Sequence, residues 1–276
     1  MNQPKYSDSP SLPQGLVALS FDDGRIDNYT VALEILNRYN LPATFNLTTG
    51  YIKGEFQKGR LTYAEPLTLE MVKELFALQN HEIAGHGYWH KNTKEDILQG
   101  ISELCEILGT DTLYHGGNGF ASPGTDLDLQ YYEKIKPELA EHNVKYVRLS
   151  LRYGIKRKWK VLARKVSRLL HIPALYAYAY TDTLMSDARN GLIYSVPVLA
   201  QISVAELKAL IRKAAKQKKA CVLMFHSIID AKEIRDNWDY PTQKFQQLCM
   251  FLDEMQSKNL INVVTSMTLF NALKID

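Results

Sequence analysis

The sequence predicts an α/β fold of parallel strands joined by helices, either a (β/α) barrel or a doubly wound sheet. From Leu16 onward, apolar runs of strand length alternate with stretches of helical periodicity. The chain of 276 residues is long enough for one large domain of this class, and 46% hydrophobic with 23% charged residues is an ordinary globular composition. No internal repeat or low-complexity segment interrupts the pattern.

The elements follow one another in a regular order. The apolar run LVALSF predicts a strand over 16–21, and a helix over 26–40 with a strand over 42–48 completes a β-α-β unit. A short apolar turn is expected around Phe120, and six or seven parallel strands are expected in all. Further helices are expected at 68–79, 92–108, 128–142, 203–217 and 242–257, and further strands at 81–86, 144–150, 193–198, 221–225 and 261–265.

Composition and charge exclude several classes of protein. No stretch approaches the roughly 18 to 20 apolar residues of a membrane-spanning helix, and a net charge of +3 is too small to imply nucleic-acid binding. Residues 1–15, with several Ser and Pro, predict a surface tail ahead of one domain over 16–276. The tail has no apolar run typical of a secretory signal, so a cytoplasmic location is expected, or an extracytoplasmic one if the chain is truncated.

Two adjacent carboxylates follow the first strand, in the sequence Asp22-Asp23-Gly24. Catalytic residues of barrels lie at the carboxyl ends of the strands. Neighbouring residues there point in different directions, so one carboxylate can bind a metal while the other acts as a base. The alternative is a plain turn before a helix whose N-cap is Asp27.

Three histidines lie at the ends of other strands. His86 and His90 are four residues apart, and in a helix this spacing would place both rings on one face, where two His and a nearby Asp could hold a divalent cation. His226 follows the apolar strand CVLMF, where a histidine that titrates near neutrality could be a general acid or could simply cap the strand.

Together these motifs resemble the polysaccharide deacetylase family, the NodB-homology group of carbohydrate esterases. The resemblance rests on SFDDG at 20–24, His86-x-x-x-His90, FASPG at 120–124 and VLMFHS at 222–227. It implies a distorted (β/α)7 TIM-like barrel that holds one divalent metal, usually zinc, with cobalt or nickel as alternatives. The implied roles are metal ligands (Asp23, His86, His90), catalytic base (Asp22), catalytic acid (His226) and oxyanion or substrate binding (Pro123, Gly124).

The third of these motifs departs from the family pattern. Many members carry an Arg there that pairs with the base, whereas this chain has none, so the pKa of Asp22 is expected to be higher than in those members. Arg148 resembles an Arg that a subgroup places near the site and could tune the base instead, although a surface arginine is the commoner explanation. Gly124 replaces the aromatic residue of the motif, which removes one wall of the usual acetyl pocket.

Residues 151–190 break the alternation and predict an insertion on the barrel. Lys156 to Arg168 contains seven Lys or Arg and no acidic residue, and Trp159, Leu162, Val166 and Leu169 share one helical face. A helix packed on the barrel with its charged face in solvent is the simpler interpretation. Peripheral contact with a membrane, or with an anionic lipid-linked substrate, is the alternative.

The sequence therefore predicts a metal-dependent deacetylase that acts on an N-acetylated sugar unit in a glycan, an oligosaccharide or a lipid-linked precursor. Acetylated carbohydrate is the expected partner and nucleic acid is not. Two alternatives remain open: a barrel that binds carbohydrate or a partner without turnover, and an amidase that acts on a small non-sugar amide.

Overall fold

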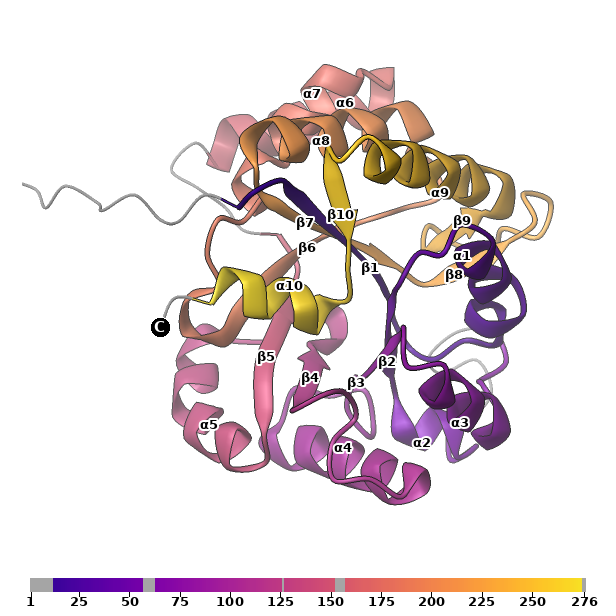
Figure 1. Ribbon diagram of the computed structural model, residues 1–276, viewed down its shortest axis with the longest axis vertical. Coiled ribbons are helices and arrows are strands. Elements are labelled where there is room, and N and C mark those ends of the chain that lie inside the picture. The colour runs from indigo at the N-terminus through magenta and orange to yellow at the C-terminus, as the bar shows by residue number, and fades with distance from the viewer. Residues whose placement is uncertain (1–11, 57–62, 126, 152–156, 275–276) are drawn as a thin grey trace, which may run out of the picture.

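In the computed structural model, seven parallel strands form a closed barrel, and an eighth strand pairs with the first half of β1 (Figure 1). The structure describes residues 12–56, 63–125, 127–151 and 157–274. The barrel closes where β1 pairs with β7 from Leu16↔Ala220 to Phe21↔Phe225. The strands are β1 (Gly15–Phe21), β2 (Thr44–Leu47), β3 (Glu82–Gly85), β4 (Asn118–Ala121), β5 (Val144–Leu149), β6 (Leu192–Pro197), β7 (Ala220–Phe225) and β10 (Ile261–Val263).

The barrel is distorted at its first strand. β2 pairs only with the last two residues of β1, Ser20 and Phe21, whereas β10 pairs with the first three, Gly15 to Val17. This confirms the expected (β/α)7 barrel. The segment around Phe120, expected as a turn, is the strand β4, and the expectation was wrong because a four-residue strand that begins with Asn-Gly gives little strand signal.

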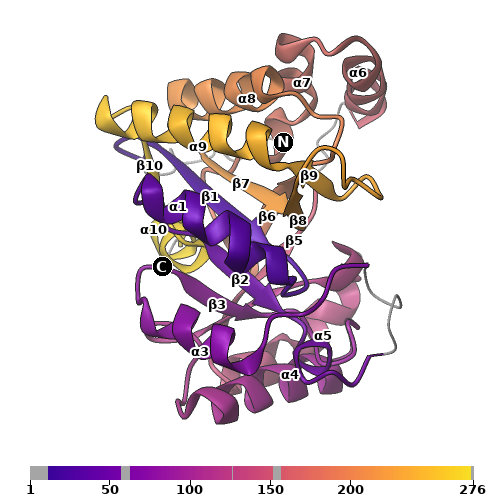
Figure 2. The ribbon, with the colours of Figure 1, turned by 90° about the vertical axis from the view of Figure 1, so that its right-hand side faces the viewer.

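Helices surround the barrel, and each main helix follows a strand (Figures 1 and 2). A π-helical stretch at Asn28–Leu33 leads into α1, and a short parallel pair, β8 (Ser227–Ile229) and β9 (Asp239–Pro241), extends beyond β7. The helices are α1 (Glu34–Arg38), α2 (Thr49–Ile52), α3 (Leu69–Ala77), α4 (Lys94–Leu108), α5 (Leu129–Glu141), α6 (Arg157–Leu170), α7 (Pro173–Ala179), α8 (Val204–Gln217), α9 (Thr242–Ser257) and α10 (Ser266–Leu273).

The alternation of side chains along β1 separates an apolar layer from a polar interior. Phe21 packs on Phe45 and Phe225 with ring centroids 5.3 and 5.4 Å apart, and on Phe245 of the outer helix α9. Because successive residues of a strand face opposite sides, Ser20 and Asp22 then point into the barrel. The polar interior is therefore a direct result of the register of β1.

Two segments have a different environment from the one expected. Residues 1–11 lie outside the described residues, but Leu12 is buried beside Leu16, so the surface tail does not extend to residue 15. Within the predicted insertion, residues 152–156 also lie outside the described residues, and α6 and α7 lie next to one another beside α8 (Figures 1 and 2). No helix in the described part of the chain is long and apolar enough to cross a membrane.

Candidate metal and catalytic site

The carboxyl end of β1 places the two aspartates in different surroundings. Asp22 continues the strand, with its N–H donating to Phe225 O at 2.9 Å, and its side chain is 2% exposed. At Asp23 the backbone turns into the left-handed region with φ 77°, followed by Gly24 at φ 82°. A non-glycine residue in this region is strained, and such strain is concentrated at functional sites. The turn directs the Asp23 carboxylate away from that of Asp22.

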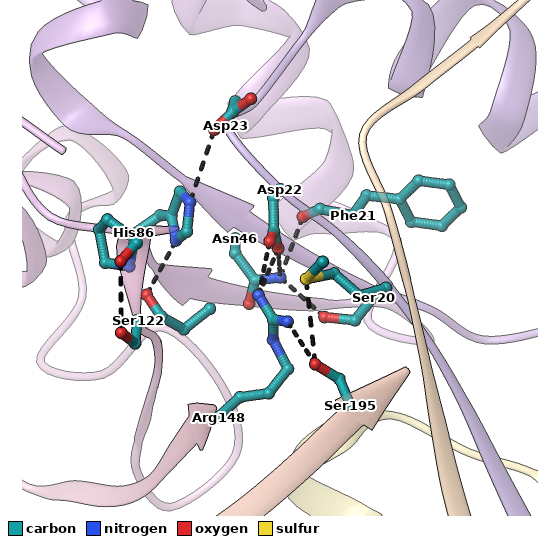
Figure 3. Close-up of polar contacts among 12 residues, drawn as sticks. Ser20, Phe21, Asp22, Asp23, Asn46, His86, Ser122, Arg148 and Ser195 are labelled. Carbon is teal, nitrogen blue, oxygen red and sulfur yellow. Dashed lines mark hydrogen bonds and ion pairs between the residues drawn. The ribbon is translucent and has the colours of Figure 1, made fainter. Parts of the chain in front are cut away.

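Asp22 is held inside the barrel by a buried ion pair (Figure 3). Arg148 Nη2 lies 2.6 Å from both Asp22 oxygens, Asn46 Nδ2 donates to Asp22 Oδ1 at 2.8 Å, and Arg148 Nη1 donates to Ser195 Oγ at 2.8 Å. Arg148 is fully buried. The preference for a surface arginine was therefore wrong, because the side chain of Arg148 points from β5 into the barrel.

The ion pair decides the charge of Asp22. Burial alone would raise the pKa of this carboxyl group, but the Arg148 guanidinium opposes it and the pKa is lowered below its ordinary value. The expectation that this pKa is higher than in family members with the third-motif Arg stays a prediction; Arg148 supplies the charge partner that the motif itself lacks. Asp22 is thus an ionised carboxylate near neutral pH, as a base must be.

Asp23, His86 and His90 form a cluster whose ligand atoms all lie within 4.8 Å of one another. Asp23 Oδ1 is 3.5 Å from His86 Nε2 and 3.4 Å from His90 Nε2. His86 Nδ1 donates to Ala121 O at 2.8 Å, which leaves the lone pair of Nε2 directed to the cluster. Asp23 Oδ1 is buried and has no hydrogen-bond partner among the described residues. A divalent cation would satisfy that oxygen, and two imidazoles with one carboxylate are a ligand set that zinc favours.

A loop, rather than a helix, brings His90 to the cluster. The conditional expectation of a helical i, i+4 pair was wrong, because Gly87 (φ 79°) and His90 (φ 57°) are left-handed and no helix forms between β3 and α4. The Asp96 carboxylate holds the loop by accepting hydrogen bonds from the N–H groups of Trp89 (2.7 Å) and Lys91 (2.9 Å). The ring centroids of His86 and His90 are 4.9 Å apart.

Three residues that support the aspartates were not predicted. Arg25 Nε and Nη2 lie 3.0 and 2.9 Å from Asp23 Oδ2, and this pairing leaves Oδ1 for the cluster. Asn46 and Ser195 contact Asp22 and Arg148 inside the barrel. In the sequence, the only features that could have indicated them are polar residues within otherwise apolar strands and an Arg directly after Asp-Asp-Gly. Burial alone would raise the pKa of Asp23, but the neighbouring side chains of His86, His90 and Arg25 favour the charged carboxylate, so the pKa lies well below its ordinary value.

His226 follows β7 and packs on Trp238 in a tilted arrangement, with ring centroids 4.5 Å apart. Its Nδ1 is buried and has no hydrogen-bond partner in the described part of the chain. Desolvation lowers the pKa of His226 to about 4, although Asp23 and Asp22 act in the opposite direction. The expectation that this histidine titrates near neutrality was wrong for the protein alone: His226 is neutral at pH 7.

The third motif, FASPG at 120–124, lies next to the loop that carries His90. Pro123 and Gly124 belong to a single 3₁₀ turn after β4, with Gly124 at φ 60°, and they line an open surface pocket together with His90, Lys91 and Asn92. Asn92 Nδ2 donates to Pro123 O at 2.8 Å and fixes this turn to the His90 loop. A group bound at the cluster can therefore extend into this pocket.

Comparison with known proteins agrees with this geometry. Residues 9–115 match the family model described as polysaccharide deacetylase, which confirms the resemblance over that part of the chain. No curated protein matches the chain.

Solved structures similar to this chain include the BpsB deacetylase domain from Bordetella bronchiseptica, at 16% identity and a TM-score of 0.39 over 50% of this chain and 64% of that one. The Xyl-CE4 domain of a multidomain xylanase from the hindgut metagenome of Trinervitermes trinervoides is 15% identical, with a TM-score of 0.47 over 94% and 90%. The CE4 family pseudoenzyme BA3943 from Bacillus anthracis is 15% identical, with a TM-score of 0.44 over 96% and 68%.

Proposed function

We propose that the protein is a metal-dependent deacetylase that removes the acetyl group from an N-acetylated sugar unit of a glycan, an oligosaccharide or a lipid-linked precursor. The observation that carries the proposal is a buried carboxylate, Asp22, paired with Arg148 and close enough to the cluster of Asp23, His86 and His90 for their charges to act on it (Figure 3). A protein that only binds its ligand has no use for this pairing of a base with a cation site. The family match over residues 9–115 supports the same reaction class.

A bound zinc ion, or cobalt or nickel, would supply a water molecule of lowered pKa and would polarise the acetyl carbonyl. Asp23, His86 and His90 would hold it, with Arg25 fixing the second oxygen of Asp23. This set leaves a position open for water and substrate, as catalytic sites require.

Asp22 is placed to take the proton that water gives up. Arg148 and Asn46 fix its carboxylate, so the oxygens do not have to reorient to accept that proton. His226 is the candidate donor to the departing sugar amine. Because His226 is neutral in the free protein, the proton that Asp22 takes from water would pass to His226, whose pKa rises as negative charge develops in the site, and from there to the amine. The turn at Pro123 and Gly124 then offers backbone contacts for the acetyl oxygen.

The test separates metal binding from turnover. Elemental analysis of the purified protein is expected to give about one ion per chain, lost in Asp23→Ala and His86→Ala but kept in Asp22→Asn. Acetate release from a panel of N-acetylated oligosaccharides is expected in the wild type and lost in all three variants. A matched control is His142→Ala, which removes the histidine directly after α5, outside the cluster.

Each failure has a distinct meaning. No metal after incubation with zinc, cobalt or nickel would refute the cation site. Metal bound at Asp23 with no acetate released from any acetylated sugar would refute the deacetylase, and cleavage of small non-sugar amides instead would establish an amidase. Full activity of Asp22→Asn would remove this residue from the role of base.

A further inference from the structure

The helix α6 (Arg157–Leu170) exposes its apolar face to solvent. The exposed fractions are 67% for Trp159, 49% for Leu162, 79% for Leu169 and 57% for Leu170, and the apolar surface continues to Ile172 at 39%. Large apolar side chains on a surface helix of a globular domain usually face the core. A contiguous apolar stripe on the outside marks an interaction surface.

The opposite face of α6 attaches the helix to the protein mainly through polar contacts. Lys160 is buried, with Nζ donating to Tyr178 O at 2.8 Å and lying 3.4 Å from Asp182 Oδ1. Ser167 is fully buried and its hydroxyl donates to Glu206 Oε1 of α8 at 2.9 Å. The simpler interpretation of the sequence, an apolar face on the barrel with the charged face in solvent, was therefore wrong. These polar anchors fix the rotation of the helix with its apolar stripe outward.

The charge around the stripe indicates what covers it. Residues 151–181 contain eight Lys or Arg and no Asp or Glu. Lys158 and Lys165 are exposed on the same side of α6 as Leu162, where their side chains can reach anionic groups beside the apolar stripe. Pairing with a second copy of this chain through a symmetric contact would bring two such basic surfaces together, which like-charge repulsion opposes.

We propose that α6 docks the protein on the surface of an anionic lipid membrane, with Trp159, Leu162 and Leu169 at the level of the acyl chains and the flanking lysines on the headgroups. An apolar stripe bordered by Lys and Arg, with Trp and Leu on the apolar side, is the arrangement of helices that lie in the membrane interface. Figure 2 shows α6 at the outer edge of the molecule beside α7, so that a flat surface can reach it. Docking there does not depend on the proposed deacetylase activity.

The test is flotation of the full-length protein with vesicles of two compositions. Binding is expected to vesicles of equal parts phosphatidylcholine and phosphatidylglycerol, and to weaken in high salt, but not to vesicles of phosphatidylcholine alone. Leu162→Asn is expected to weaken partitioning about tenfold, from the apolar area it removes, and Lys165→Gln about fivefold, from the loss of one charge near the surface.

Two matched controls test whether the effect is local. Leu129→Asn changes a leucine of α5 that is 50% exposed, nearly the same exposed fraction as that of Leu162. Lys134→Gln changes an exposed lysine of α5, to match Lys165→Gln. Both are expected to bind like the wild type. The fluorescence of Trp159 should shift to the blue on binding, and Trp159→Phe should lose that shift while its thermal unfolding stays unchanged.

Three outcomes would overturn the proposal. The first is equal binding to both kinds of vesicle. The second is an equal loss of binding in Leu129→Asn and Leu162→Asn. The third is a wild-type dimer that Leu162→Asn converts to a monomer while neither protein floats with vesicles, which would assign the stripe to a second copy.

Discussion

Replacing Arg148 with methionine is expected to destabilise the barrel by about 3–5 kcal/mol. Arg148 is fully buried and Asp22 is 2% exposed, so removal of the guanidinium leaves a carboxylate with no cation inside the protein. At an effective dielectric constant near 20, two charges about 4 Å apart interact by roughly 4 kcal/mol. Asn46 still donates one hydrogen bond to Asp22, which offsets part of that loss.

Urea unfolding at pH 7 measures this effect, and a double-mutant cycle assigns it to the pair. Asp22→Asn in the Arg148→Met background removes the uncompensated charge, so the double variant should regain about 2 kcal/mol or more over Arg148→Met alone. The control is Arg38→Met, because Arg38 forms a solvent-exposed pair with Glu34 at 3.0 Å and should contribute less than about 0.5 kcal/mol.

Two results would contradict this role of Arg148. A loss below about 1 kcal/mol in Arg148→Met would show that water reaches Asp22 and replaces the guanidinium. Additive losses in the double variant would show that the two side chains stabilise the barrel independently. Either result would refute the view that Arg148 takes the place of the arginine missing from the third motif.

Two further predictions concern a buried carboxyl group at the start of β3 and the loop that carries His90. Burial raises the pKa of Glu82 to about 7 in the folded protein. Because this pKa is higher than that of the unfolded chain, the free energy of unfolding should fall by about 3 kcal/mol as the pH rises from about 4.5 to 7. Glu82→Gln should remove this pH dependence from urea unfolding measured over that range. Gly100→Ala would place a Cβ 2.8 Å from the backbone of Gly87 and 2.9 Å from that of Tyr88. The substitution should lower the free energy of unfolding by about 1–3 kcal/mol and weaken zinc binding measured by calorimetry. Unchanged zinc affinity would show that the His90 loop tolerates displacement.

The positions of Asp22, His86 and His226 could be predicted because they depend on topology alone. Each residue directly follows a buried strand, and a parallel barrel gathers the carboxyl ends of its strands at one end. No knowledge of side-chain packing was needed. The same reasoning could not reach Arg25 or Asn46, whose contacts with the aspartates depend on how a turn and a second strand are placed in space.

His90 shows a correct residue reached through an incorrect local structure. The four-residue spacing from His86 was interpreted as one turn of helix, and the structure reaches the same proximity with two left-handed residues and the Asp96 carboxylate. A helix and a tight loop both bring residues i and i+4 close together, so the spacing alone does not distinguish them.

Arg148 and α6 show why burial is harder to predict than secondary structure. The alternation along β5 places Arg148 on one face of its strand, but only the position of Asp22 across the barrel makes that face a favourable place for a guanidinium. In α6 the periodicity correctly predicts a helix with an apolar face and a polar face. Hydrogen-bond acceptors on other elements then determine which face is buried: Tyr178 O accepts from Lys160, and Glu206 accepts from Ser167. A rotation of α6 that buried Leu162 and Leu169 would free both acceptors and the Lys160 charge. The outward apolar stripe is therefore retained by polar contacts whose loss would leave an unpaired charge and unpaired acceptors inside the protein.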